Sequence, residues 1–354
     1  MTFPRIIKIG ERLVGEGHPA FFIADIGANF DHNLEKAKKL ALAAKEAGAD
    51  VVKFQSFLAE KIVSGPSFAK MKLKGVHGSW NRPIEEVFKE AEFPREWHQE
   101  LADYCKSIGV AFSSAAYDFE GVDLLEKIGV DFYKIGSGEI TWPEMLEHVA
   151  KKGKPMILAT GDSTLAEVDE AVRIIEATGN NQLILLQCIT NYPSKIESAN
   201  INVLKTYQQA FPEIITGYSD HSPGDVVVLG SLALGGKVFE KHFTLSKKDK
   251  GPDHPHSMEP QDFKQMVERA RQLEKALGSS KKEVVEEEAE TVIVQRRSLH
   301  VNRPIKKGEI IKKEDIVELR PAVGVLPKYK NLVVGKKAKV DIGSREAIYW
   351  ENIE

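Results

Sequence analysis

Two histidines in the second half of the chain each follow a short run of β-branched and apolar residues. Residues 214–216 lead into His221, and residues 238–239 lead into His242, with a helical apolar pattern between the two runs. Parallel strands joined in this way end at the same edge of a sheet. The two imidazoles are therefore expected to be neighbours that can share one divalent metal ion. The alternative is that each is a partly buried, hydrogen-bonded histidine.

Polar or ionisable residues also stand at the ends of the other runs that resemble strands. The full set is Asp25, Lys53, Ser114, Lys134, Thr160, Thr190, His221 and His242. If the strands are parallel and form a closed barrel, these residues meet at one rim, where barrel enzymes carry their chemistry. Two lysines that converge with hydroxyls are suited to bind a phosphate or carboxylate. The hydroxyls expected in this cradle are those of Ser114, Ser137 and Ser219. A metal on the histidines would act as a Lewis acid.

Eight strand–helix repeats are needed to position these residues. The predicted strands are 21–24, 51–55, 110–112, 132–135, 155–158, 183–186, 214–216 and 238–239, with helices between them and a last helix over 260–276. Apolar strands alternating with helices predict a parallel sheet covered on its faces. Eight such repeats predict an α/β fold of the (β/α)8 TIM barrel type. A doubly wound open sheet is the alternative, although residues 136–138 match its glycine fingerprint only in part.

The segment 56–95 is rich in Lys, Gly and Pro and is predicted to be an irregular insertion. A loop of this length in a compact domain is usually functional, for example as a lid. A disordered surface excursion is the alternative.

The composition changes after Gly278 and suggests three parts. We predict a barrel domain over 1–280, a charged linker over 281–294 and a small domain over 295–354. About 60 residues is close to the lower limit for independent stability, so the small domain is expected to pack on the barrel or on a neighbouring subunit.

The overall charge and composition exclude several classes of protein. The 354 residues carry a net charge of −3, which provides no electrostatic footprint for nucleic acid or an anionic membrane. Cys105 and Cys188 lie in apolar surroundings without CxxC spacing, so no disulfide framework is expected. The N-terminus has no signal-peptide pattern, and no apolar run approaches the length of a membrane span. We expect a soluble cytoplasmic protein.

The motifs at the strand ends resemble those of the sialic acid synthase family, whose members make nine-carbon nonulosonic acids. The matching segments are 24–27 (ADIG), 47–50 (AGAD), 52–55 (VKFQ), 133–139 (YKIGSGE), 160–161 (TG), 191–193 (NYP), 217–222 (GYSDHS), 240–244 (EKHFT) and 251–253 (GPD). Residues 305–308 and 319–321 resemble the antifreeze-like (SAF) domain, a β-clip fold, that is fused to these barrels.

The resemblance implies an N-acetylneuraminate synthase, a transferase that condenses phosphoenolpyruvate with N-acetylmannosamine or a related N-acetylated hexosamine. The reaction releases phosphate by C–O cleavage, and Mn²⁺ or Mg²⁺ is held by His221 and His242. The implied catalytic residues are Glu139, Lys53 and Asp25. The implied substrate-binding residues are Lys134, Ser114, Ser137, Ser219, Gln55, Thr160, Tyr192, Asp253 and Arg320. The family forms a domain-swapped homodimer in which an SAF arginine, here Arg320, closes the partner's site.

Departures from the family pattern leave the acceptor open. Asp25 stands where the family usually has Glu, and Ala159 stands where it often has Ser. Thr190 replaces a more usual amide or serine, and residues 29–32 (NFDH) replace the common NHxG. Acceptors of the legionaminic, pseudaminic or spore-coat type remain alternatives. Two further alternatives are a metal-dependent aldolase or isomerase that acts without phosphoenolpyruvate, and a glycan- or ice-binding protein that acts through the tail.

Overall fold

The chain forms two units, Met1–Gly278 and Ser279–Glu354, which are described separately. The computed structural model describes residues 2–72 and 82–354. In the first unit, eight parallel strands close into a barrel in the order β10-β3-β4-β5-β6-β7-β8-β9. The strands are β3 Phe21–Asp25, β4 Val51–Ser56, β5 Ala111–Ala116, β6 Tyr133–Ile135, β7 Met156–Ala159, β8 Leu183–Cys188, β9 Ile215–Asp220 and β10 Val238–His242.

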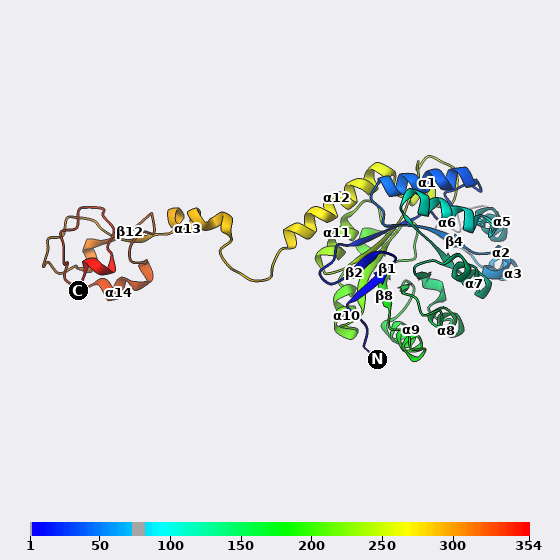
Figure 1. The fold of residues 1–354 in the computed structure, drawn as a ribbon, viewed down its shortest axis with the longest axis horizontal. Helices are drawn as coiled ribbons and strands as arrows, with labels where there is room; N and C mark the ends of the chain where they lie inside the picture. Colours follow the sequence, from blue (N-terminus) through cyan, green and yellow to red (C-terminus); the bar gives the residue numbers. More distant parts are fainter. Residues whose placement is uncertain (1, 73–81) are drawn as a thin grey trace. The chain divides into compact units, whose positions relative to one another are not determined.

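Helices surround this barrel (Figure 1). They are α1 Leu34–Glu46, α6 Trp97–Ile108, α7 Phe119–Ile128, α8 Pro143–Ala150, α9 Leu165–Ala177, α10 Val203–Ala210, α11 Val226–Ala233 and α12 Pro260–Leu277. The predicted (β/α)8 barrel is confirmed, and the open-sheet alternative is wrong. Strands β9 and β10 are longer than predicted, because their polar ends continue the parallel ladder.

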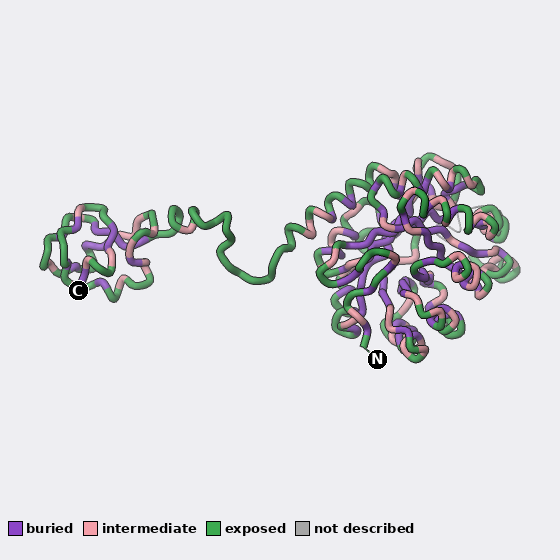
Figure 2. The backbone as a smooth tube through the Cα atoms, in the orientation of Figure 1, coloured by how far each residue is buried: buried purple, intermediate pink, exposed green. Residues whose placement is uncertain are grey.

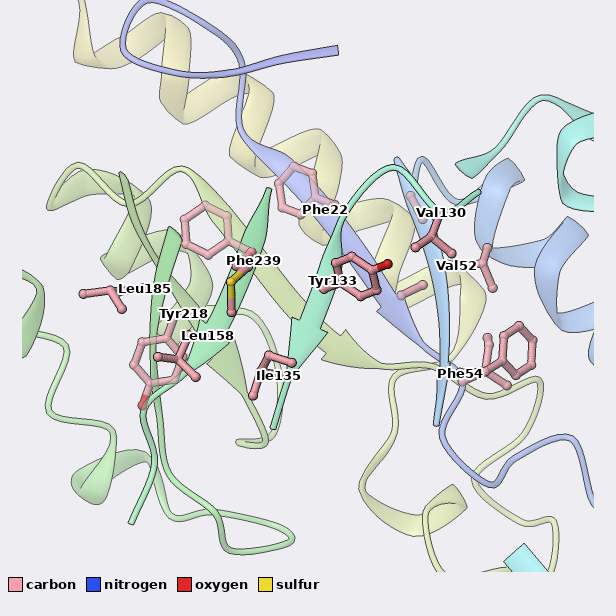
Figure 3. Close-up of a cluster of buried hydrophobic side chains, with 14 of the residues drawn as sticks. Phe22, Val52, Phe54, Val130, Tyr133, Ile135, Leu158, Leu185, Tyr218 and Phe239 are labelled. Carbon is pink, nitrogen blue, oxygen red and sulfur yellow. The ribbon is translucent and has the colours of Figure 1, made fainter. Parts of the chain in front are cut away.

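Side chains alternate between the two faces of each barrel strand, as the period of two requires. One set packs outward against the helices; Figure 3 shows Phe22, Phe54 and Tyr133 among them. The other set points into the barrel, where Phe21 and Ile23 belong to a separate core cluster. Strand residues are accordingly buried on both faces, whereas the outer helix surfaces are exposed (Figure 2).

A hairpin that the sequence reading did not predict closes the floor of the barrel. Strands β1 Ile6–Ile9 and β2 Arg12–Gly15 pair antiparallel. Ile7, Ile9 and Val14 are buried in the cluster of inward-facing barrel residues. The N-terminal ends of the strands are therefore plugged by apolar side chains, which leaves the opposite rim for a cavity.

The insertion is more regular than predicted. It contains α2 Ala59–Ile62, α3 Gly65–Phe68 and α5 Ile84–Ala91, while residues 73–81 lie outside the described residues. The apolar side chains of α5 recur at positions 84, 87, 88 and 91, which is helical spacing. The prediction of an irregular loop was wrong for these segments because that spacing was overlooked among the surrounding Lys, Gly and Pro residues.

The second unit has its own core, built mostly from bridges and turns. Its elements are η4 Glu286–Glu288, α13 Ala289–Gln295, β11 Ser298–Val301, η5 Lys313–Asp315, β12 Ile316–Leu319, η6 Pro327–Tyr329, α14 Lys330–Val333 and η7 Trp350–Asn352. β11 and β12 are antiparallel, and Leu299, Ile311 and Ile348 are fully buried. The predicted linker 281–294 includes η4 and most of α13 and is exposed along nearly its whole length (Figure 2). No helix within the described ranges is long and apolar enough to cross a membrane.

The floor hairpin offers a matched pair of stability variants. Ile7→Ala should lower the free energy of unfolding by about 2–5 kcal/mol, because it removes a buried side chain from the barrel floor. Ile6→Ala changes the same residue type one position earlier, where the side chain is 43% exposed, and should cost less than about 0.5 kcal/mol. Urea unfolding of the full chain measures both. Equal effects of the two variants would mean that the hairpin does not stabilise the barrel.

Candidate active site

A cavity of about 500 Å³ opens at the carboxyl ends of the barrel strands, a size typical of small-molecule sites. The predicted site residues that line it are Asp25, Lys53, Gln55, Lys134, Ser137, Glu139, Tyr192, Ser219, His221, His242 and Asp253. The expected convergence of lysines, acids, hydroxyls and imidazoles therefore occurs.

Ser114 and Thr160 do not line this cavity. The Ser114 hydroxyl lies 2.6 Å from the Ser56 hydroxyl. The Thr160 hydroxyl donates to the Leu186 carbonyl at 2.9 Å and lies 2.8 Å from the Tyr207 hydroxyl. Both residues stand an even number of positions from outward-facing apolar residues of their strands, so the alternation turns their side chains toward the helices.

Arg320 belongs to the second unit, directly after β12, and is joined to Pro321 by a cis peptide bond. It is exposed in that unit, and its expected role in closing a partner's site stays a prediction.

A buried ion pair joins the first two strands of the site. The Lys53 ammonium donates to Asp25 Oδ2 at 2.7 Å, and both side chains are nearly inaccessible to solvent. The Gln55 amide donates to the same oxygen at 3.1 Å, and the Gly27 amide donates to Asp25 Oδ1. Burial lowers the pKa of Lys53, but the nearby carboxylates of Asp25 and Glu240 raise it by more. The pKa of Lys53 is therefore raised overall. Lys53 is therefore a buried, charged ammonium at the cavity.

Glu240 is a cavity residue that the sequence reading missed. Its Oε1 lies 3.8 Å from Lys53 Nζ and 3.6 Å from Lys134 Nζ, and accepts from the Ser219 hydroxyl at 3.1 Å. Its Oε2 is buried without a hydrogen-bond partner. Glu240 precedes His242 by two positions on β10, so the period of two was the signal that could have identified it.

Glu139 lies on a short 3₁₀ turn, η1 Ser137–Glu139, beyond β6. Its Oε2 is buried without a partner, and a Cβ on Gly136 would come within 2.5 Å of that atom. Glycine at 136 therefore leaves room for the carboxyl group. Burial raises the pKa of Glu139 to about 7 against the opposing influence of Lys134. A carboxyl group with this pKa exchanges protons readily near neutral pH.

The predicted histidine pair is assembled around an aromatic ring. The rings of His221 and His242 have centroids 5.4 Å apart, and the Tyr192 ring lies 4.2 Å from that of His221. His221 Nδ1 lies 2.9 Å from the Ile189 carbonyl oxygen, which favours a proton on Nδ1 and a free lone pair on Nε2. Such an arrangement is typical of a metal-binding imidazole.

The donor set of the cavity fits a divalent cation. Nδ1 of His242 is buried without a hydrogen-bond partner, and donor atoms of His242, Asp253 and His256 all lie within 4.8 Å of one another. His242 Nε2 also lies 3.6 Å from Asp25 Oδ2. Imidazole and carboxylate donors in this number are what first-row divalent metals bind. His256 is a second residue that the sequence reading missed, since it follows no strand.

The electrostatics of these groups agree with a cation site. Burial, reinforced by His256 and His221, lowers the pKa of His242 well below its usual value, so the ring is neutral and its lone pair is available. Burial, together with the nearby charge of Asp25, raises the pKa of Asp253 to about 6. A cation would relieve this crowding of carboxylates.

One wall of the cavity is apolar and comes largely from the insertion. Its residues are Phe57, Ile62 of α2, and Val87, Phe88 and Ala91 of α5. Lys53 and Lys134 are the only lysines among the described residues that line the cavity, and that part of the lining contains no arginine. The site therefore combines a compact charged region with an uncharged one.

Comparison with known proteins agrees with these observations. The sequence profile of the NeuB family matches residues 40–282, and that of the SAF domain matches residues 296–354. An uncharacterized protein of Methanocaldococcus jannaschii is 41% identical, with 98% of each chain covered. The N,N'-diacetyllegionaminic acid synthase of Legionella pneumophila is 36% identical over 96% of each chain. The crystal structure of a sialic acid synthetase from Leptospira borgpetersenii has a TM-score of 0.73 and 28% identity, and covers 82% of this chain and 96% of that one.

The raised pKa of Glu139 predicts a pH-dependent stability change. Folded Glu139 retains its proton up to about pH 7, whereas the unfolded side chain releases it near its usual value, so folding loses stability as the pH rises between the two. Glu139→Gln removes this titration. The variant should gain on the order of 1–3 kcal/mol relative to the wild type between pH 4.5 and pH 8.

Urea unfolding at the two pH values measures this difference, and the exposed Glu144 supplies the control substitution Glu144→Gln. The free energy of unfolding of the control should match that of the wild type at both pH values. If the free energy of unfolding of Glu139→Gln also matches it, the Glu139 carboxyl group titrates normally in the folded protein.

Proposed function

Because this chain belongs to the NeuB family of nonulosonic acid synthases, we propose that it condenses phosphoenolpyruvate with an N-acetylated hexosamine. The reaction is a transferase reaction that forms a C–C bond and releases phosphate by C–O cleavage. The observation that carries the proposal is the pair Lys53 and Lys134, which share Glu240 in the lining of the cavity.

Phosphoenolpyruvate carries a carboxylate and a phosphate ester on the same carbon, C2. Two ammonium groups that flank one carboxylate are suited to a ligand with two anionic groups, because each can exchange part of its interaction with Glu240 for the incoming anion. The Ser137 and Ser219 hydroxyls add donors on the same lining. Asp25, Gln55, Tyr192 and Asp253 are then available to the hydroxyls of the acceptor.

The proposed steps balance without a further reactant. The methylene carbon of phosphoenolpyruvate bonds to the aldehyde carbon, whose oxygen takes a proton, and water adds to C2. The C2 hydroxyl then becomes the keto group as the C2–O bond to phosphate breaks, so phosphate leaves with the bridging oxygen and takes up the hydroxyl proton. Glu139 takes the proton of the attacking water, a role supported by its pKa of about 7. His221 and His242 would hold a divalent cation, which would supply Lewis acidity when bound.

The competing functions make different demands on these residues. An aldolase or isomerase that acts without phosphoenolpyruvate does not need Lys134. A glycan- or ice-binding protein that acts through the tail would be indifferent to His221→Ala. The buried, unpaired oxygens and nitrogens that converge on the cavity support the synthase, since a scaffold has no use for groups that are costly to bury.

The apolar wall favours a particular class of acceptor. A phosphorylated hexosamine would need cations in addition to the two lysines, and the described lining offers none besides the histidines. Ile62, Val87 and Ala91 are suited instead to methyl groups, which a 2,4-diacetamido-2,4,6-trideoxyhexose carries at three positions. We therefore propose this class as the second candidate beside N-acetylmannosamine, the acceptor predicted from the sequence.

Labelled substrate tests the condensation directly. With phosphoenolpyruvate carrying ¹⁸O in the C–O–P bridge, Mn²⁺ and either acceptor, the label should appear in the released phosphate. Lys134→Met should lower kcat/KM by at least about 100-fold, because it removes a cation that faces the substrate anions. Mass spectrometry of the phosphate and a phosphate-release assay provide the two readouts.

Lys151→Met serves as the matched control, since Lys151 is exposed on the outside of the barrel and pairs with Glu147. EDTA and His242→Ala should each abolish turnover without unfolding the protein. Absence of phosphate release with every acceptor in the panel would count against the synthase, and label retained in the organic product would exclude C–O cleavage.

The acceptor preference can be tested with a nearly isosteric change in the wall. Val87→Thr replaces a methyl with a hydroxyl and should lower kcat/KM for the diacetamido trideoxy sugar by about tenfold, with less than a threefold effect for N-acetylmannosamine. Val226→Thr, at a 61% exposed position on α11, is the control. Equal losses for both sugars would mean that the wall does not contact the acceptor's methyl groups.

The remaining features expected of the family stay predictions. These are the domain-swapped homodimer, the role of Arg320, the cytoplasmic location, and the division into a barrel domain (1–280), a linker (281–294) and an SAF domain (295–354).

A further inference from the structure

A third imidazole points into the cation region of the cavity. His256 lies at the end of η3 His254–His256, in the loop that follows β10. Its side chain is only 3% exposed, and its Nε2 is buried with no hydrogen-bond partner. Burying a polar nitrogen without a partner costs free energy, so this atom needs a ligand that the protein itself does not supply.

The neighbouring His254 shows what a structural histidine looks like in the same turn. Its Nδ1 lies 2.6 Å from the Thr244 hydroxyl, and its Nε2 lies 2.9 Å from Asp31 Oδ1. Both ring nitrogens are therefore satisfied by the protein. His256 differs because its buried Nε2 faces other donor atoms that lack partners.

The unsatisfied nitrogens of two histidines converge on one carboxylate. His256 Nε2 lies 3.9 Å from Asp253 Oδ1, and His242 Nδ1 lies 4.0 Å from Asp253 Oδ2. The two imidazole rings have centroids 4.9 Å apart. Ligands bound to one first-row metal ion at about 2.1 Å are separated by up to about 4.2 Å, so these spacings suit a shared ion.

The backbone leaves room beside these donors. Gly27 has a φ of +52°, and a Cβ there would lie 2.3 Å from Asp253 Oδ2 and 3.1 Å from His242 Nδ1. The Ala28 amide donates to Asp253 Oδ2 at 2.8 Å, which orients the carboxylate. Any side chain at position 27 would displace the carboxylate and crowd the imidazole.

We propose that His256 is a ligand of the divalent cation, together with His242 and Asp253. This set of two imidazoles and one carboxylate keeps His242 from the pair predicted from the sequence, in which His221 was the second ligand. It assigns Asp253 to the cation instead of to the acceptor hydroxyls. It favours Mn²⁺ or another first-row transition metal over Mg²⁺, because Mg²⁺ prefers oxygen donors. The inference rests on the proposed function only in assigning the cation to the same cavity.

Direct Mn²⁺ binding tests the assignment without substrates. The free-Mn²⁺ electron paramagnetic resonance signal is titrated with the full-length wild type, with His256→Ala and with His256→Gln, which retains more of the side-chain volume. Both variants should bind Mn²⁺ at least about tenfold more weakly, since the loss of even an outer-shell partner has that effect. In competition with Mg²⁺, both variants should prefer Mn²⁺ by a smaller factor than the wild type does.

His148→Ala is the control, because His148 lies on the barrel exterior and pairs with Asp123. Circular dichroism and thermal unfolding establish that each variant is folded. The visible absorption of bound Co²⁺ provides a second readout, which should change in His256→Gln and remain unchanged in His148→Ala.

Unchanged Mn²⁺ affinity in a folded His256 variant overturns the proposal. If affinity then falls only in His221→Ala and His242→Ala, the cation belongs to that pair alone. Phosphate release by the wild type is measured separately, so failure of the synthase assay and failure of the ligand assignment remain distinguishable. Weaker Mn²⁺ binding in both His256 variants supports the assignment whatever the acceptor sugar is.

Discussion

The site depends on one buried charge cluster in which Lys53 lies between Asp25 and Glu240. Its ion pair with Asp25 spans 2.7 Å across the adjacent strands β3 and β4, and Glu240 reaches it from β10. Removing three charged groups from water is costly unless each is compensated by the others, and deleting one partner of such a group typically costs 3–5 kcal/mol. The closed ladder holds the strands in a register that makes this compensation possible. The cluster in turn leaves one oxygen of Glu240, which lines the cavity, without a partner.

Much of this arrangement follows from the period of two and could be predicted from the sequence. The two lysines and both predicted histidines meet at the rim, whereas Ser114 and Thr160, which were predicted to join them, do not line the cavity. The strand ends alone did not predict which residues face into the barrel and which face the helices. Ser114 and Thr160 share the outward face with Phe112 and Leu158. Their hydroxyls therefore form hydrogen bonds on the side of the barrel that faces the helices. Counting back by two from His242 would have added Glu240 to the site.

Features outside the strands could not be obtained in that way. His256 belongs to a turn, and its position is set by long-range contacts: Asn29 donates to the Ser257 hydroxyl, which in turn donates to the Asp253 carbonyl. No local pattern encodes which turn residue faces the cavity. The floor hairpin is similar, because its short alternation becomes meaningful only once a barrel end needs to be covered. Helix α5 did carry a local signal, which its charged surroundings obscured.

The distribution of unsatisfied groups separates the structural polar residues from the functional ones. Lys241 and Asp220 are as buried as Lys53 and Asp25, yet they face outward and satisfy one another at 2.6 Å, with Ser222 completing the network. That pair fixes the ends of β9 and β10. On the inward face of β10, His242 Nδ1 and Glu240 Oε2 have no partner in the protein. Alternation thus gives each strand end two chemically distinct sides. The buried polar groups on the side that faces the helices find partners within the protein, whereas those on the side that faces the cavity require a ligand.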